Sequence, residues 1–82
     1  MTSSSIITID VHGMTQYQAQ IAISAQLRRA GSGVYRLRII HGYHGGTALR
    51  DMIRREYGKN SKVKRIEFGL NQGETDLVLR EF

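Results

Sequence analysis

Short β-rich segments alternate with helix-patterned segments along this chain, and this alternation leaves few folds open to it. The expected elements are a strand over residues 5–11, a helix over 16–30, a strand over 33–41, a helix over 47–57, and two strands within 62–70 and 74–82. Consecutive β-α-β units have right-handed crossovers, which place both helices on one face of the sheet. The pattern predicts an α/β fold, a two-layer sandwich of order β-α-β-α-β-β. Its first three strands run parallel, and the fourth returns antiparallel through a hairpin at residues 71–73, a glycine-containing turn.

Both helix segments have one face at helical spacing and recognisable ends. In the first, Thr15 and Gln18 have the spacing of a capping box, and Gly31 is a stop signal. The buried face is expected at Ala19, Ala22, Ile23, Gln26, Leu27 and Ala30 in the first helix, and at Leu49, Met52, Ile53 and Tyr57 in the second.

The chain is long enough for one hydrophobic core. Its 82 residues predict a single domain over 1–82, with residues 1–5 as a disordered tail, that buries roughly 60 to 65% of its unfolded surface. No cysteine is present, no signal peptide is recognisable, and no apolar run approaches the about 18 residues of a membrane span. We therefore expect a cytoplasmic protein that does not bind membranes.

Positive charge is concentrated in the middle of the sequence. The formal net charge is +5, and eleven of the twelve Lys and Arg residues lie between Arg28 and Arg65, where the only acids are Asp51 and Glu56. A polyanion such as nucleic acid is the expected partner of such a surface. The alternative is that these charges only solvate the helix faces.

Three loops are expected to meet at the carboxyl edge of the sheet, where α/β proteins bind their ligands. They follow the first three strands and carry all three histidines (His12, His41 and His44) and six of the nine glycines (Gly13, Gly42, Gly45, Gly46, Gly69 and Gly73). The sequence therefore predicts a functional site at this edge.

Asp10 lies two residues before His12, so on an extended chain both side chains point to the same side. A carboxylate beside an imidazole raises its basicity and lets it accept a proton from water or a ribose hydroxyl. The alternative is that Asp10 only satisfies loop N–H groups, that His41 packs at a strand end, and that His44 is a solvated loop residue. Zinc or manganese held by Asp10 and the histidines is disfavoured, because the spacing matches no standard zinc pattern.

The second loop leads into a helix whose first N–H groups and macrodipole favour a phosphate. Glycines permit close approach of a phosphate, and arginines clamp it. The residues expected to bind phosphate or the nucleic-acid backbone are Gly13, Gly42, His44, Gly45, Gly46, Thr47, Arg50, Arg54, Arg36 and Arg38. Tyr43 has the chemistry to stack on a base, although an exposed loop tyrosine needs no such role.

The segments "IDVHGMT", "RIIHGYHGGTALRDMI" and "GLNQGETDLVL" together resemble the Smr (small MutS-related) domain, from Ile6 to Phe82. The first family motif, Leu-Asp-x-His-Gly, corresponds to residues 9–13, with Ile9 in place of leucine. The second motif, His or Thr followed by Gly-x-Gly and a helix, begins at His41 and Gly42.

The resemblance implies a fold similar to the C-terminal domain of the third bacterial translation initiation factor, with sheet order 1243 and the fourth strand antiparallel. It also implies DNA-nicking or RNA-cleaving endonuclease activity, with Asp10, His12 and the glycine loop at His41 as the working parts. Members occur attached to MutS-like ATPases, attached to RNA-binding repeats, and as short stand-alone proteins. They differ in their need for divalent metal, so magnesium and manganese are the candidate cofactors.

The second loop departs from the family pattern, because His44 stands where a glycine is usual and the loop is one residue longer. Either Gly45 or Gly46 takes over the backbone role, or the phosphate pocket is altered. Two hypotheses follow. One is an endonuclease with Asp10, His12 and His41 as its catalytic residues; the other is a non-catalytic module that binds RNA, DNA or the ribosome.

Overall fold

The computed structural model describes residues 5–43, 47–68 and 71–80. Its elements are β1 (Ser5–Asp10), α1 (Gln16–Arg29), β2 (Val34–Ile40), α2 (Ala48–Tyr57), β3 (Arg65–Glu67) and β4 (Glu74–Val78). The expected order of strands and helices is therefore confirmed.

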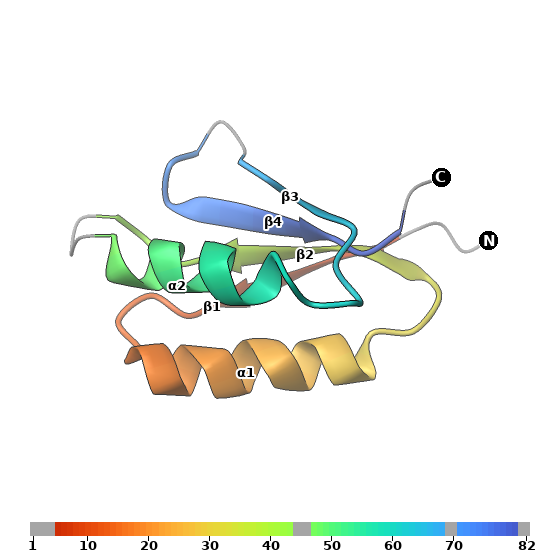
Figure 1. The fold of residues 1–82 in the computed structure, drawn as a ribbon, viewed down its shortest axis with the longest axis horizontal. Helices are drawn as coiled ribbons and strands as arrows, with labels where there is room; N and C mark the ends of the chain where they lie inside the picture. Colours follow the sequence, from red (N-terminus) through yellow and green to blue (C-terminus); the bar gives the residue numbers. More distant parts are fainter. Residues whose placement is uncertain (1–4, 44–46, 69–70, 81–82) are drawn as a thin grey trace.

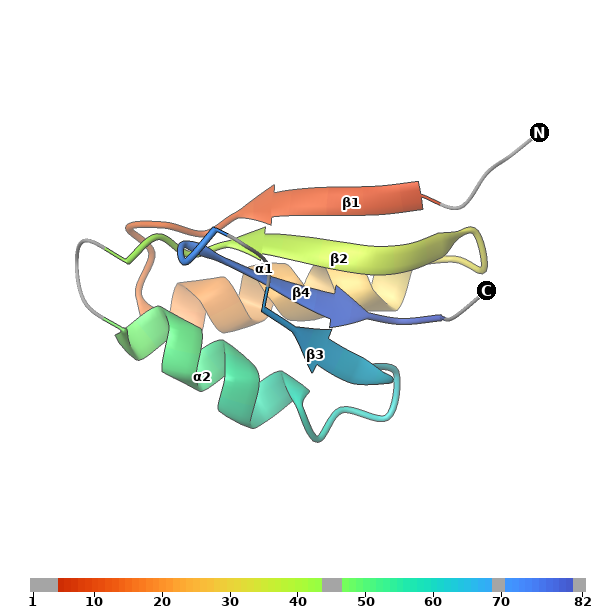
Figure 2. The same cartoon turned by 90° about the horizontal axis from the view of Figure 1, so that it is seen from above.

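The four strands form one mixed sheet in the order β1-β2-β4-β3. β1 and β2 are parallel, and β4 is antiparallel to both of its neighbours, β2 and β3. Both helices cover the same face of the sheet, and the opposite face carries no helix (Figure 1). The strands lie side by side in this order in Figure 2, where β1 and β2 end at the same edge. The predicted two-layer sandwich and its strand order are correct.

The helices begin and end where local chemistry allows. Thr15 and Gln18 form a complete capping box, in which the Gln18 N–H donates to Thr15 Oγ1 over 3.1 Å and the Thr15 N–H donates to Gln18 Oε1 over 3.0 Å. α1 ends at Ala30, whose N–H still reaches the carbonyl of Gln26. Within the described residues, neither helix combines the length and the apolar character that crossing a bilayer requires.

The core lies between the helices and the inner face of the sheet. α1 contributes Ala19, Ile23 and Leu27, and α2 contributes Met52, Ile53 and Tyr57, as their helical spacing predicts. These side chains pack against the apolar side chains of the sheet and its flanks, namely Val11, Leu37, Ile39, Val63, Leu77 and Leu79. Apolar burial of this kind holds the strands' carboxyl ends, and the loops that follow them, in place.

The last two strands are shorter than expected. The chain turns at residues 60–63, where the Val63 N–H donates to the Asn60 carbonyl, and only Arg65–Glu67 belongs to β3. The turn before β4 is closed by Asn71, whose side-chain oxygen accepts from the Gly73 N–H over 2.8 Å. β4 begins at Glu74 as the pattern predicts, so its shortening lies after Val78, and that of the third strand lies mainly at residues 62–64.

Candidate functional site

The loops that follow β1 and β2 meet the turn before β4 at one edge of the sheet, which we call the loop edge (residues 10–13, 41–43 and 71–73). The carbonyl of Gly73 accepts hydrogen bonds from the N–H groups of His41 and Gly42, over 2.9 and 3.0 Å. A Cβ on Gly73 would lie 3.3 Å from the Cα of Gly42, and a Cβ on Gly42 would lie 3.6 Å from the Cβ of His12. The backbones of the second loop and of the turn before β4 are thus in direct contact, and the side chain of His12, from the first loop, lies beside Gly42.

Two glycines of the loop edge adopt backbone conformations that other residues avoid. Gly13 has φ +80° and Gly42 has φ +73°, and no non-glycine residue in the described part of the chain has a positive φ. The left-handed region is disfavoured for any residue with a Cβ. The "His-Gly" pairs after β1 and β2 therefore have a backbone requirement for glycine, independent of any ligand.

Asp10 and His12 are in contact at the end of β1. Oδ1 of Asp10 lies 2.5 Å from Nδ1 of His12 and also accepts the His12 backbone N–H over 3.0 Å. The bond with the His12 side chain, followed by the backbone bond, lowers the pKa of Asp10, so this carboxyl group is ionised at neutral pH. Both side chains are more than half exposed.

This contact decides which ring nitrogen of His12 carries the proton. A carboxylate can only accept, so Nδ1 is the donor and Nε2 of a neutral ring is left as the acceptor. Nε2 has no hydrogen-bond partner among the described residues. The arrangement can accept a proton from a bound molecule.

His41 is in a different environment. It is 4% exposed, its Nδ1 lies 2.7 Å from the carbonyl oxygen of Gly42, and its Nε2 lies 2.9 Å from Oγ1 of Thr75 on β4. Burial lowers its pKa against an opposing contribution from the Gly42 carbonyl, and the positive charges of Arg54 and Arg50 lower it further. A neutral ring that donates from Nδ1 and accepts at Nε2 satisfies both bonds. His41 therefore joins the loop edge to β4, and its expected catalytic role stays a prediction.

A pocket of about 630 Å³ opens beside the pair of Asp10 and His12. It lies between the loop after β1, the loop after β2 and the starts of the two helices, and it is lined by residues 12–16, 40–43 and 48–49. His12 is at its wall, so a ligand in the pocket can reach the imidazole. Tyr43, which is about half exposed, is also part of the lining.

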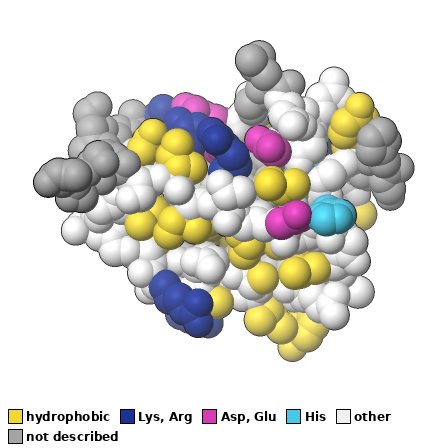
Figure 3. All heavy atoms as spheres, turned by 180° about the vertical axis from the view of Figure 1, so that it is seen from behind, with side chains coloured by type: hydrophobic (Ala, Val, Ile, Leu, Met, Phe, Trp, Pro, Cys, Tyr) yellow, Lys and Arg dark blue, Asp and Glu magenta, His cyan; other side chains and the backbone are white. Residues whose placement is uncertain are grey.

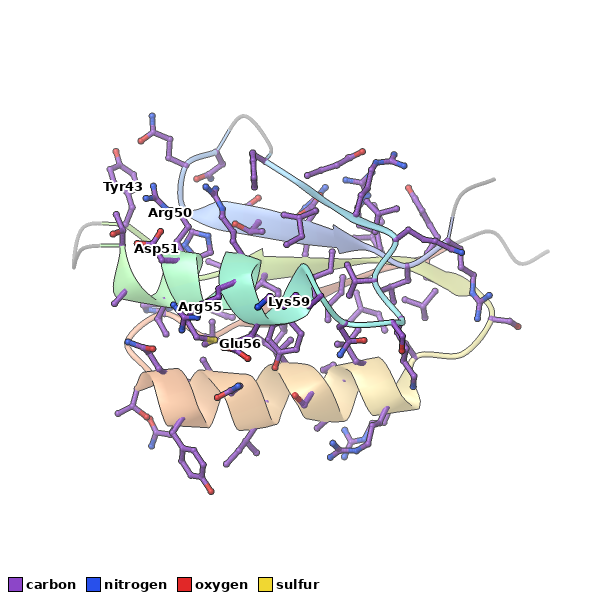
Figure 4. The ribbon with its side chains drawn as sticks, in the orientation of Figure 1. Tyr43, Arg50, Asp51, Arg55, Glu56 and Lys59 are labelled. Carbon is purple, nitrogen blue, oxygen red and sulfur yellow. The ribbon has the colours of Figure 1, made fainter. Side chains whose placement is uncertain are left out.

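The start of α2 already carries a carboxylate. The Thr47 hydroxyl donates to Oδ2 of Asp51 over 2.9 Å, and Nε of Arg50 donates to Oδ1 over 3.2 Å. The hydrogen bond from Thr47, followed by that from Arg50, lowers the pKa of Asp51. Figure 4 shows Tyr43, Arg50 and Asp51 at this end of α2. The helix N-terminus expected to receive a phosphate thus has an acid in its first turn, which competes with an incoming anion.

Arg36 and Arg38 lie on the helix-free face of the sheet, where acids surround them. Arg36 donates to Asp76 over 2.7 Å and pairs with Glu67 over 2.8 Å, while Arg38 pairs with Asp76 over 3.1 Å and with Glu74 over 3.9 Å. Burial alone would raise the pKa of Asp76, but the hydrogen bonds from Arg38 and Arg36 outweigh it and lower that pKa. In Figure 3, which views the molecule from the opposite side to Figure 1, Lys or Arg side chains lie beside Asp or Glu side chains at the top. The expectation that Arg36 and Arg38 bind the nucleic-acid backbone stays a prediction; the alternating pattern of β2 could not reveal the acids of β3 and β4 that pair with them.

Some of the residues expected at the site lie outside the described residues, and the structure also brings to the site two residues that the sequence did not predict. His44, Gly45, Gly46 and Gly69 belong to the first group. Asp76 and Thr75 were missed, since their partners are more than 30 positions away and no local pattern links them. In the described part of the chain, no three or more His, Cys, Asp or Glu side chains are grouped so as to hold a metal ion.

Comparison with known proteins agrees with this geometry. The sequence pattern of the Smr domain matches residues 9–76, which include Asp10, His12, both loops and most of β4. The structure is similar to the crystal structure of the Smr domain of Thermus thermophilus MutS2, with a TM-score of 0.82 and 28% sequence identity over 92% of this chain and 99% of that one. Among curated protein sequences, none matches significantly. Because the family pattern spans most of the chain and the fold agrees throughout, this protein belongs to the Smr domain family.

Proposed function

We propose that this Smr domain is an endonuclease that cleaves phosphodiester bonds, with His12 as its general base and Asp10 as the residue that orients and activates it. The observation that supports this most directly is the contact between Asp10 and His12, which leaves Nε2 of an exposed imidazole as an acceptor at the wall of the pocket. The structural similarity to a MutS2 domain is consistent with a nucleic-acid substrate, as is the positive net charge.

In the proposed reaction, Nε2 of His12 takes the proton of a water molecule or of a ribose 2′-hydroxyl. The oxygen that loses this proton attacks the phosphorus atom, the bond between phosphorus and the departing oxygen breaks, and the departing oxygen is protonated by solvent. The Asp10 carboxylate stabilises the imidazolium that forms. His41 is a positioning residue, because its two hydrogen bonds hold Gly42 and β4 beside this pair.

The cations of α2 provide the phosphate contacts in this proposal. Arg50 and Arg54 lie one helical turn apart, and their charges reach His41 at the loop edge. Arg36 and Arg38 contribute less than expected from the sequence, because their shared partner Asp76 is buried, whereas Asp51, the partner of Arg50, is more than half exposed.

One observation favours the alternative of a non-catalytic nucleic-acid-binding module. Asp51 and its bond with Thr47 put a negative charge at the start of α2, where the helix N-terminus led us to expect a phosphate. A domain of this kind would bind the polymer without holding the scissile group against His12.

The deciding experiment is a cleavage assay on supercoiled plasmid and on structured single-stranded RNA, with magnesium, manganese or a chelator. We expect His12→Ala and Asp10→Asn to lower the rate, by about a hundredfold or more for His12→Ala. Circular dichroism verifies that both variants fold. Glu56→Gln makes the same carboxylate-to-amide change on the outer side of α2 and should not lower the rate.

An unchanged rate in folded His12→Ala would remove His12 from the mechanism. Salt-sensitive binding with no product under any metal condition would instead establish the binding module.

A further inference from the structure

Arg54 and Phe68 form a stacked pair beside the loop edge. The guanidinium carbon of Arg54, on α2, lies 3.8 Å from the centre of the Phe68 ring, which follows β3 directly. Phe68 is nevertheless 63% exposed. One ring face is thus covered by the guanidinium, while more than half of the surface of Phe68 stays accessible to solvent.

Arg54 differs from the neighbouring arginines in having no acid partner among the described residues. Arg50 pairs with Asp51 and Arg55 pairs with Glu56, whereas the Nε of Arg54 is buried and makes no hydrogen bond within the described part of the chain. A buried N–H without a partner is costly, so such groups in native structures call for an explanation. Figure 4 places Arg55, Glu56 and Lys59 on the side of α2 that is turned away from the sheet.

Packing alone explains part of this arrangement. A long arginine side chain covers apolar surface, and a stacked guanidinium shields one face of an exposed aromatic ring. This leaves Phe68 largely exposed, and it leaves Arg54 without a salt bridge to any acid in the described part of the chain. Both remaining features suit a ligand that has a flat apolar ring and a negative charge.

We propose that Phe68 and Arg54 form a stacking platform for one unpaired base of a single-stranded nucleic acid, with Arg50 holding an adjacent phosphate. The inference rests on the proposed nucleic-acid substrate and goes further by naming its class: strands with unpaired bases are preferred over continuous duplex. Every base has a π-face that stacks on an aromatic ring, so the platform is tolerant of sequence. Bases within a duplex are already stacked and cannot occupy it without being pulled out.

The test compares three ligands of equal length: a single-stranded oligonucleotide, the same backbone without bases, and the duplex. We expect Phe68→Ala to weaken binding of the base-containing single strand about tenfold, because stacking of one base on an aromatic ring contributes a binding free energy of that size. Binding of the base-free strand and of the duplex should change less than twofold. Phe68→Leu keeps an apolar side chain without a ring and should behave like Phe68→Ala, which excludes a folding defect as the cause.

Arg54→Lys keeps the charge and removes the planar stack. It should therefore weaken binding of the base-containing strand more than binding of the base-free strand. Arg55→Lys makes the same change on the neighbouring residue, which does not stack on Phe68, and should not discriminate between the two strands. If Phe68→Ala weakened binding of all three ligands equally, or of none of them, the proposed stacking platform would be refuted.

The chain has no tryptophan, so Phe68→Trp introduces a single fluorophore at the platform. Base stacking should quench its emission with the single strand and not with the base-free strand. Tyr17→Trp, at a 73% exposed position on α1, is the control. Unquenched emission of Trp at position 68 with the single strand bound would refute base stacking.

Cleavage of plasmid by the wild-type protein tests the endonuclease separately. A platform without cleavage leaves this inference standing and refutes the proposed catalysis. Cleavage without any binding preference for base-containing single strands supports the proposed catalysis and refutes the stacking platform.

Discussion

The loop edge and the helix-free face of the sheet, here called the open face, both carry charged residues, but they differ in how these charges are paired. On the open face, Arg36, Arg38 and Arg65 lie among Glu67, Glu74 and Asp76 and form a network of ion pairs. At the loop edge, Asp10 contacts a histidine, and the nearby Arg54 contacts an aromatic ring and no described acid. One region has its charges neutralised inside the protein, whereas the other keeps groups available to a ligand.

The difference shows that the number of arginines in a segment does not measure its attraction for a polyanion. Arg36 and Arg38 are part of the basic block of the sequence, yet the same carboxylate, Asp76, binds both. A charge paired with a buried carboxylate releases few counterions when a phosphate arrives, so it adds little to affinity. Under the proposed function, the surface on the α2 side is the one left to bind nucleic acid.

The largest expected effect comes from removing the shared acid of the open face. Asp76→Ala leaves Arg36 and Arg38 without their main partner and should lower the free energy of unfolding by about 2–3 kcal/mol, less than for a fully buried pair because both arginines can turn toward water. Urea unfolding measures this change. Asp51→Ala removes an exposed carboxylate that also bonds an arginine and should cost much less. Similar losses in the two variants would contradict the contrast between the regions.

At the loop edge, stability should depend on backbone conformation and not on ion pairs. Gly42→Ala places a Cβ on a residue with φ +73° and should lower the free energy of unfolding by about 1–2 kcal/mol. Gly33→Ala is the matched control, since no atom lies within 4 Å of the added Cβ and its φ is outside the left-handed region. Equal stability of the two variants would mean that the loop edge relaxes freely around position 42.

Acidification should affect the two regions at different pH values. The native state holds the pKa of His41 below its ordinary value of 6.5, so between these two pKa values the unfolded chain binds more protons than the native protein. Stability should therefore fall as the pH drops below about 6.5, and His41→Gln should lack this part of the loss. Asp76, whose pKa is lowered from 3.8, contributes stability that is lost only in more acidic solution. Unfolding curves from pH 8 to pH 3 test both expectations; an identical pH profile for wild type and His41→Gln would refute the first.

The smallest effect concerns the salt dependence of nucleic-acid binding. Arg54→Gln should reduce the slope of log affinity against log salt by about 1, as expected for the loss of one phosphate contact. Arg38→Gln should leave the slope unchanged, because Asp76 already neutralises this arginine. Binding titrations at several salt concentrations give both slopes, and equal changes would show that the open face also contacts the polymer.

The fold was largely predictable from the sequence because most of its determinants are local. The capping box at Thr15 and the apolar stripes of both helices follow from helical periodicity, and both are present in the structure. The lengths of the last two strands were not predictable in this way, since the turn at residues 60–63 interrupts the pattern of the third strand and no local signal marks the end of β4 at Val78.

In the candidate site, too, contacts between residues close in the sequence were predictable, and contacts between distant residues were not. The contact between Asp10 and His12 joins side chains two residues apart, so the extended backbone at the end of β1 is enough to bring them together. The burial of His41 against Thr75, by contrast, joins positions 34 residues apart. Sequence reasoning expected a catalytic histidine there because nothing local shows which residue of β4 lies opposite.

The sequence by itself determined the element order, the buried helix faces, the glycines of the loop edge and the pairing of Asp10 with His12. Only the tertiary structure decided that Asp76 neutralises Arg36 and Arg38, that Thr75 binds His41, and that Arg54 stacks on Phe68. The physical reason is that the first group depends on backbone periodicity within a few residues. The second depends on which strands pair, in which register, and on which helix packs beside them.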